Sequence, residues 1–183
     1  MTKTEIREAI REKVLMSEIP PGAWVDEEEL AREFRVSRTP IREICMYLAA
    51  ERVLDHHPGQ GAQTPRIDLE RVRSMLEMAR IIYPKMHAGA ARRMSEADHE
   101  TLAGIVAEIG AVEGPGVSEE GVRLRRRFLA TCATLAGNCF MAWFGNSLAF
   151  EECRVLRHVL LMNGHRLASA EALRTDAEGF ARI

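Results

Sequence analysis

Two short helical patterns follow one another within residues 26–48, and this closeness limits what the chain can fold into. Asp26 and Ser37 each precede a pattern and are typical N-cap residues. Each pattern has one apolar face, formed by Leu30, Ala31 and Phe34 in the first and by Ile41, Ile44 and Leu48 in the second. Arg35 and Val36 leave room only for a tight turn between them. The segment therefore predicts a helix-turn-helix.

A further helix is predicted ahead of this pair. Thr2 with Glu5 three residues later has the spacing of a capping box. Ile6, Ile10 and Val14 follow at intervals of four and predict a single buried stripe. The run Pro20-Pro21-Gly22 is expected to stop this helix.

The second helix of the pair has a basic side. Residues 32–42 contain four arginines, Arg32, Arg35, Arg38 and Arg42, against one acid, Glu33, although the whole chain has a net charge of −2. Arg38, Thr39 and Arg42 fall away from the apolar stripe, near the helix N-terminus. Such a position suits contact with base edges in the major groove, and the Ser37 hydroxyl suits a phosphate oxygen. The alternative is that the charges form an ordinary solvated helix face.

A β-hairpin is predicted after this helix. Val53-Leu54 reads as one strand, residues 57–61 as a turn, and residues 62–64 as the returning strand. Gly59 and Gly61 would let the backbone approach a sugar-phosphate chain closely, with His56 and His57 able to contact phosphate.

These segments resemble the winged helix of the GntR family of bacterial regulators. The resemblance covers about residues 5–64 and rests on residues 19–22, on residues 26–31, and above all on the run VSRTPIRE at residues 36–43. It implies DNA contacts by Ser37, Arg38 and Arg42, with Thr39 beside them and a wing glycine, Gly59 or Gly61. Arg52 departs from the family, which usually has glycine there, and is expected to stiffen or shift the hairpin.

The fold class predicted is mainly α. Residues 1–65 form the winged helix-turn-helix, residues 66–68 a linker, and residues 69–183 an all-α bundle. Helices are expected over about 69–94, 95–112, 118–135, 140–161 and 169–183, with a loop at 113–116. The first of these carries the stripe Val72, Leu76, Ala79 and Tyr83, and Pro84 should kink it.

The bundle resembles the FCD ligand-binding domain of the FadR subfamily, apparently shortened at its C-terminus. The resemblance rests on Arg80 and on the stretch FLATCATLAGN at residues 128–138. Many FCD domains bind a metal through one Asp and three His. Here Arg125, Leu129 and Ala177 stand at the positions that can be aligned, so no metal site and no cofactor are expected.

Arg125 suggests two opposed hypotheses. If its guanidinium is buried, it needs an anionic partner, which could be Glu151, Glu152 or a small carboxylate effector held together with Arg80. The alternative is that residues 125–127 form an exposed basic strip.

Other classes of protein find little support. No secretory signal and no apolar run of membrane-spanning length is visible, so a cytoplasmic protein with no membrane contact is expected. The four cysteines lack metal-site spacing and read as reduced, mostly buried thiols. A nucleophile and base could be formed only by Cys132 or Cys153 with His158. Cys153 and His158 are five residues apart, which is poor spacing for one helix face, so an enzyme is not expected.

The sequence thus predicts a transcriptional regulator that binds a double-stranded DNA operator as a homodimer, reading half-sites about one helical turn apart. It would be a repressor released by a small organic acid. In the alternative, the C-terminal bundle is only a dimerisation scaffold with no effector or metal site.

Overall fold

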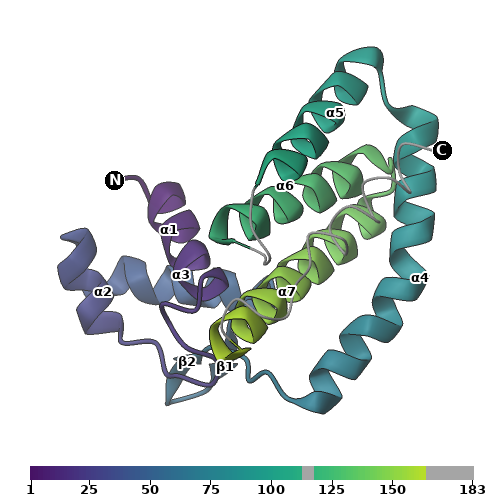
Figure 1. The fold of residues 1–183 in the computed structure, drawn as a ribbon. Coiled ribbons are helices and arrows are strands. Elements are labelled where there is room, and N and C mark those ends of the chain that lie inside the picture. The colour runs from purple at the N-terminus through teal and green to yellow at the C-terminus, as the bar shows by residue number, and fades with distance from the viewer. Residues whose placement is uncertain (113–117, 164–183) are drawn as a thin grey trace. The chain divides into compact units, whose positions relative to one another are not determined.

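The computed structural model describes residues 1–112 and 118–163, which are predominantly helical (Figure 1). The chain divides between Arg71 and Val72 into two compact units, residues 1–71 and 72–183. The mainly helical fold class predicted from the sequence is confirmed. Within the described residues, no helix has the length and apolar character needed to cross a membrane.

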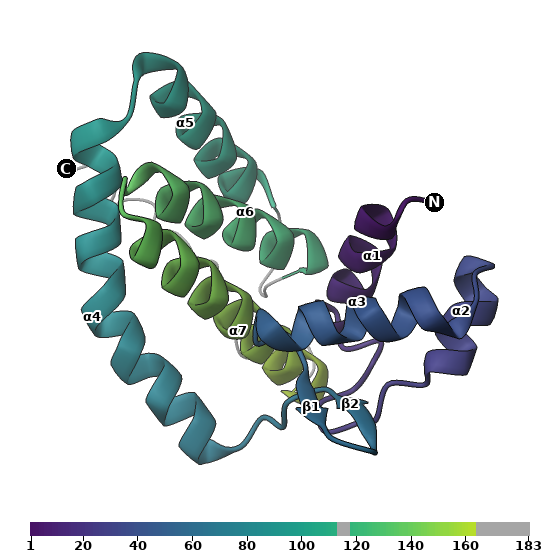
Figure 2. The ribbon, with the colours of Figure 1, turned by 180° about the vertical axis from the view of Figure 1, so that it is seen from behind.

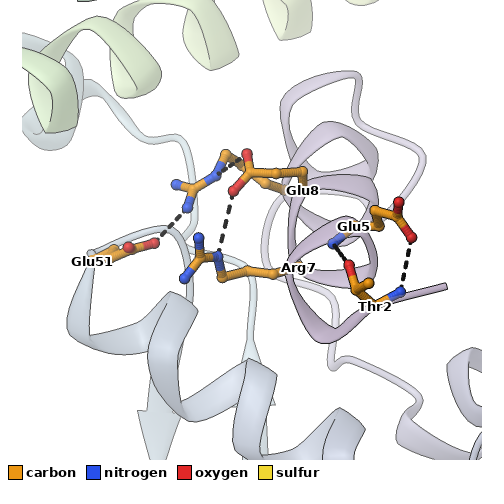
Figure 3. Close-up of polar contacts among 6 residues, drawn as sticks. Thr2, Glu5, Arg7, Glu8 and Glu51 are labelled. Atoms are coloured by element: carbon orange, nitrogen blue, oxygen red, sulfur yellow. Dashed lines mark hydrogen bonds and ion pairs between the residues drawn. The ribbon is translucent and has the colours of Figure 1, made fainter.

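The first unit begins with three helices, α1 (Lys3–Leu15), α2 (Glu27–Phe34) and α3 (Arg38–Ala50). The predicted capping box is present: the Glu5 N–H donates to the Thr2 hydroxyl at 3.2 Å, and the Thr2 N–H donates to the Glu5 carboxylate at 2.8 Å (Figure 3). α1 ends at Leu15, earlier than the predicted stop at residues 20–22. The reason is local, because Ser17 takes a left-handed conformation with φ of 61°.

α1 and α2 both pack against α3 and make the core of this unit. The side chains that form it are at most 6% exposed and come from the predicted stripes: Ile6, Ile10 and Val14, Leu30 and Ala31, and Ile41, Ile44 and Leu48. At the edge of this contact, Arg11 of α1 donates to Glu8 and to Glu51, the residue that follows α3.

The hairpin consists of β1 (Asp55–His57) and β2 (Gly61–Gln63), paired antiparallel with Asp55 opposite Gln63. The strand predicted at Val53-Leu54 is therefore wrong by two residues. The N–H groups of Val53 and Leu54 both donate to the Leu48 carbonyl, at 2.9 and 3.3 Å, and so cannot join a strand ladder. The returning strand begins one residue earlier than predicted, at Gly61.

The end of α3 explains why glycine would suit position 52. The Arg52 N–H donates to the Ala49 carbonyl and the Val53 N–H to the Leu48 carbonyl, the two bonds of a Schellman motif. This motif needs a left-handed residue, and Arg52 has φ of 64°. The side chain is accommodated at the surface, where Arg52 is exposed, at the cost of an unfavourable backbone conformation.

The second unit contains α4 (Leu69–Arg93) from Val72 onward, α5 (Glu96–Ala111), α6 (Glu119–Leu135) and α7 (Cys139–Asn163). α6 and α7 lie side by side and α5 packs on α6, as Figure 2 shows from behind. Ser95 and Ser118 cap α5 and α6, Ser95 in a capping box with Asp98. α4 continues as one helix through Pro84.

The predicted stripe on α4 is wrong in part. Leu76 is 50% exposed, and the buried residues of α4 are Met75, Met86, Gly89 and Ala90. Val72, Ala79 and Tyr83 are half-buried, so the rest of the stripe faces inward, and Met75 is buried in place of its neighbour Leu76. The predicted loop at 113–116, the helix at 169–183 and Ala177 lie outside the described residues.

The conformation of Arg52 gives a prediction about stability. Arg52→Gly should raise the free energy of unfolding by roughly 0.5–1 kcal/mol, because glycine accepts a left-handed conformation without a Cβ clash, partly offset by a freer unfolded chain. Urea unfolding followed by circular dichroism measures this. Arg52→Ala removes the same charge but keeps the Cβ, so it should give no gain. Equal stabilities of the two variants would contradict the explanation.

Candidate nucleic-acid interface

The turn between α2 and α3 is held by backbone interactions that the sequence encodes locally. The Asp26 carboxylate accepts hydrogen bonds from the N–H groups of Glu28 and Glu29, both at 2.9 Å, and so fixes the start of α2. Arg35 ends that helix with a left-handed φ of 55°, and the Val36 N–H donates to the Ala31 carbonyl at 3.0 Å. This turn sets the direction in which α3 leaves.

The first turns of α3 present polar side chains to solvent. Arg38, Thr39 and Arg42 are all exposed, whereas Ile41 and Ile44 on the other side are at most 2% exposed. Arg38 and Arg42 are four residues apart and therefore project from the same side of the helix. Arg32 and Arg35 are exposed as well.

Ser37 is the N-cap of α3 by its backbone conformation, with φ of −73° and ψ of 167°, but its side chain makes no capping hydrogen bond. This differs from the prediction that Ser37 caps the helix, and from Asp26, whose carboxylate does cap α2. The exposed Ser37 hydroxyl is thus not occupied by the helix it precedes. It can serve a ligand beside the first-turn N–H groups, where a helix attracts anions.

A concavity of about 360 Å³ lies between α3 and the hairpin. Its lining joins segments far apart in the sequence and includes Glu28 from α2, Arg38 and Arg42 from α3, and His56, Gly59 and Gly61 from the hairpin. Two of the predicted arginines, Arg38 and Arg42, and the predicted wing glycines therefore face one space. His56, which the sequence predicts as a phosphate contact, shares it. Glu28 shares it too, although the sequence predicted no site there.

Charges in the concavity are mixed. Nη1 of Arg38 donates to Oε1 of Glu28 at 2.7 Å, and both side chains remain more than 60% exposed. An ion pair with this exposure contributes little to folding and can open readily. A run of residues that reads as basic in sequence is thus partly neutralised by a carboxylate from the preceding helix.

The hairpin tip is shaped by its two glycines. Gly59 and Gly61 have φ of 78° and 107°, which side chains rarely adopt, and no atom would obstruct a Cβ at either position. Backbone conformation rather than crowding therefore requires glycine here. His57 is half-buried and packs edge-on against Trp24, with 5.0 Å between ring centres, whereas His56 is exposed and lines the concavity.

In the second unit, Arg125 is buried against an acid. Its Nε donates to Oε1 of Glu152 at 2.8 Å, and the two side chains are only 13% and 16% exposed. Tyr83 of α4 donates its hydroxyl to the same carboxylate. Burial, then the Glu152 charge, raises the pKa of Tyr83 well above its usual range, so the phenol stays protonated and can donate.

The burial of Arg125 bears on the two hypotheses that the sequence offered for residues 125–127. The prediction of an exposed strip is wrong for Arg125, and of the two acids considered, Glu152 is its partner while Glu151 pairs with Arg154. Arg127 is exposed, as is Arg80 on α4, so Arg80 and Arg125 stand in unlike surroundings.

The three buried cysteines are poor nucleophiles. Cys45, Cys132 and Cys153 are buried free thiols, and burial raises the pKa of each to about 12, opposite to the shift that activates a thiol. Cys139 is free and exposed. Among residues 1–112 and 118–163, no three His, Cys, Asp or Glu side chains are grouped as a metal site would need, and Leu129 is buried.

Comparison with known sequences places residues 2–63 in one family. They match the sequence model described as bacterial regulatory proteins, gntR family. A helix-turn-helix transcriptional regulator from an unstable DNA locus of Streptomyces ambofaciens is 43% identical over 63 residues. That match covers 34% of this chain, and the chain spans only 27% of that relative's length. The regulator LutR of Bacillus subtilis strain 168 is 26% identical over 165 residues, which are 80% of this chain and 74% of LutR.

Solved structures extend the likeness of the fold over both units. McbR/YncC of E. coli aligns over 99% of this chain and 84% of its own, with a TM-score of 0.74 and 18% identity. A GntR structure from Rhodococcus sp. RHA1 aligns over 98% and 96%, with a TM-score of 0.62 and 18% identity. Residues 2–63 are therefore similar to the GntR family of bacterial regulators, and the chain folds as a winged helix-turn-helix followed by a helical bundle.

Proposed function

We propose that this chain is a DNA-binding transcriptional regulator that reads duplex DNA with the N-terminal turns of α3. One observation carries the proposal: Arg38 and Arg42 are exposed one turn apart on a helix whose opposite side is buried, and they face a concavity shared with the hairpin tip. A helix presented in this way fits the major groove, and the hairpin would lie along the adjacent backbone.

The roles of individual residues follow from their positions. Arg38 and Arg42 would donate to guanine edges or phosphates, with Thr39 beside them. The free Ser37 hydroxyl would donate to a phosphate at the α3 N-terminus. Gly59 and Gly61 would bring the hairpin backbone to the sugar-phosphate chain. Arg32, Arg35 and His57, which do not line the concavity, would contribute only sequence-independent contacts to phosphate.

The protein would act as a homodimer, because one short helix reads only a half-site and two copies read a palindrome about one turn apart. LutR and the Streptomyces relative are both described as transcriptional regulators of the helix-turn-helix type, which supports the regulatory role.

For the second unit, the surroundings of Arg125 favour a dimerisation scaffold. The competing proposal is more specific: the chain would be a repressor released by a small organic acid, and Arg80 and Arg125 would bind that acid within an FCD-type domain. Glu152 already neutralises Arg125, so such a ligand would have to displace a buried carboxylate. Arg80 is exposed and offers the ligand no second buried cation.

The DNA-reading role is tested by removing single arginines. Arg38→Ala or Arg42→Ala should cost roughly 1–3 kcal/mol in discrimination between sequences, because a bidentate base contact is lost. The measurement compares affinity for a duplex that the wild-type protein enriches from a random pool with affinity for a shuffled duplex. Arg7→Ala removes the same charge from α1 and should leave discrimination intact. Full operator preference in both α3 variants would refute the assignment.

Ser37 and Asp26 give a second test, because both are N-cap residues but their replacement should affect the free energy of unfolding differently. Ser37→Ala should leave the free energy of unfolding nearly unchanged while weakening DNA binding, since its hydroxyl makes no cap hydrogen bond. Asp26→Ala should lower the free energy of unfolding by about 1 kcal/mol, since two N–H groups lose their acceptor. Urea unfolding and duplex titration of both variants check this; a Ser37→Ala protein that is as destabilised as Asp26→Ala would contradict it.

A third test addresses the bundle. Glu152→Ala should lower the free energy of unfolding by roughly 3 kcal/mol, because the buried Arg125 guanidinium loses its counter-charge. Arg80→Ala should have little effect. Thermal unfolding of the wild-type protein should not respond to acetate, lactate or succinate, because Arg125 is already paired. A rise in Tm with any of these acids that disappears in Arg125→Ala would favour the effector hypothesis over the scaffold.

A further inference from the structure

We propose that Glu28 is a specificity-determining residue, which acts through Arg38 to make the α3 surface discriminate between DNA sequences rather than bind any duplex. This inference rests on the proposed DNA-reading function. It starts from the 2.7 Å contact between Oε1 of Glu28 and Nη1 of Arg38, which joins the first turn of α2 to the first turn of α3.

Glu28 is held in place from its backbone. Its N–H donates to the Asp26 carboxylate at 2.9 Å, in the first turn of α2. The carboxylate is therefore presented from a capped helix end rather than from a loop. The wall of the concavity thus contains a positioned anion next to the arginine that is proposed to read bases.

The contact leaves Arg38 able to read a base. A guanidinium has five N–H donors, and Glu28 uses a donor on Nη1. Other donors remain for the O6 and N7 acceptors of a guanine, which need two hydrogen bonds in one plane. While the contact with Glu28 persists, it biases the orientation of that plane and so favours the base-reading arrangement over the many orientations that would suit a phosphate.

The same carboxylate penalises binding to phosphate alone. Duplex DNA carries one negative charge per roughly 1.7 Å of its axis, and affinity that does not depend on sequence comes from neutralising those charges. The concavity wall includes the carboxylates of Asp26, Glu27 and Glu28 beside the two arginines, so its net charge offers little general attraction. Only a sequence that satisfies the guanidinium by hydrogen bonds compensates for the nearby carboxylate.

The test is Glu28→Gln, which keeps an oxygen acceptor for Arg38 and removes the charge. The probes are a duplex that the wild-type protein enriches from a random pool and a shuffled duplex of the same length and composition. Affinity for the shuffled duplex should rise about tenfold, while affinity for the selected duplex should rise less than threefold. The dependence of log affinity on log salt should steepen by about one unit for the shuffled duplex, since one repulsive charge is gone.

Glu29→Gln is the matched control. It removes the same charge from the same turn of α2, but Glu29 does not line the concavity, so the ratio of the two affinities should stay within about twofold of wild type. Equal ratios for Glu28→Gln and the wild-type protein, or equal losses in Glu28→Gln and Glu29→Gln, would overturn the inference. Neither outcome contradicts the proposed DNA-binding function. That function would be contradicted by a different result, in which the wild-type protein enriches no duplex from the random pool.

Discussion

The packing of α1 and α2 against the buried side of α3 controls the arrangement of the whole first unit. Ile41, Ile44 and Leu48 are at most 2% exposed, and burying a side chain of this size contributes roughly 1.5–3 kcal/mol. An exposed ion pair such as Arg38 with Glu28 contributes at most about 1 kcal/mol. The rotation of α3 about its own axis is therefore set by its apolar side, and the outward projection of Arg38 and Arg42 is a consequence of that packing.

Backbone conformation then decides where the elements begin and end. Arg35 and Arg52 both take left-handed conformations at the ends of helices, which lets the carbonyls of the last turn find donors. In α2 the result is the tight turn that leads into α3. In α3 the result is that residues 53 and 54 complete the helix cap, and the hairpin follows at Asp55. The concavity between α3 and the hairpin exists because of this second turn.

The charges of the proposed DNA-reading surface and those of the bundle lie in opposite surroundings. In the first unit, Arg38 and Arg42 stay in solvent, where the contact of Arg38 with Glu28 can be exchanged for another acceptor. In the second, Arg125, Glu152 and Tyr83 connect α6, α7 and α4 in a nearly buried set, where separating the charges would be costly. An exposed pair suits a surface that must rearrange on binding, whereas a buried set suits a fixed bundle.

The sequence by itself determined the features that depend on neighbours along the chain. The capping boxes at Thr2 and Ser95, the buried stripe of α3 and the turn at Arg35 were all predictable, because helix caps and helical periodicity involve residues three or four positions apart. The tertiary structure decided which groups from distant segments meet. It paired Arg125 with Glu152 rather than Glu151, set Glu28 beside Arg38, and turned His56 rather than His57 toward the concavity. These outcomes depend on how helices and strands pack and on which N–H groups are already in use, and a one-dimensional pattern contains neither.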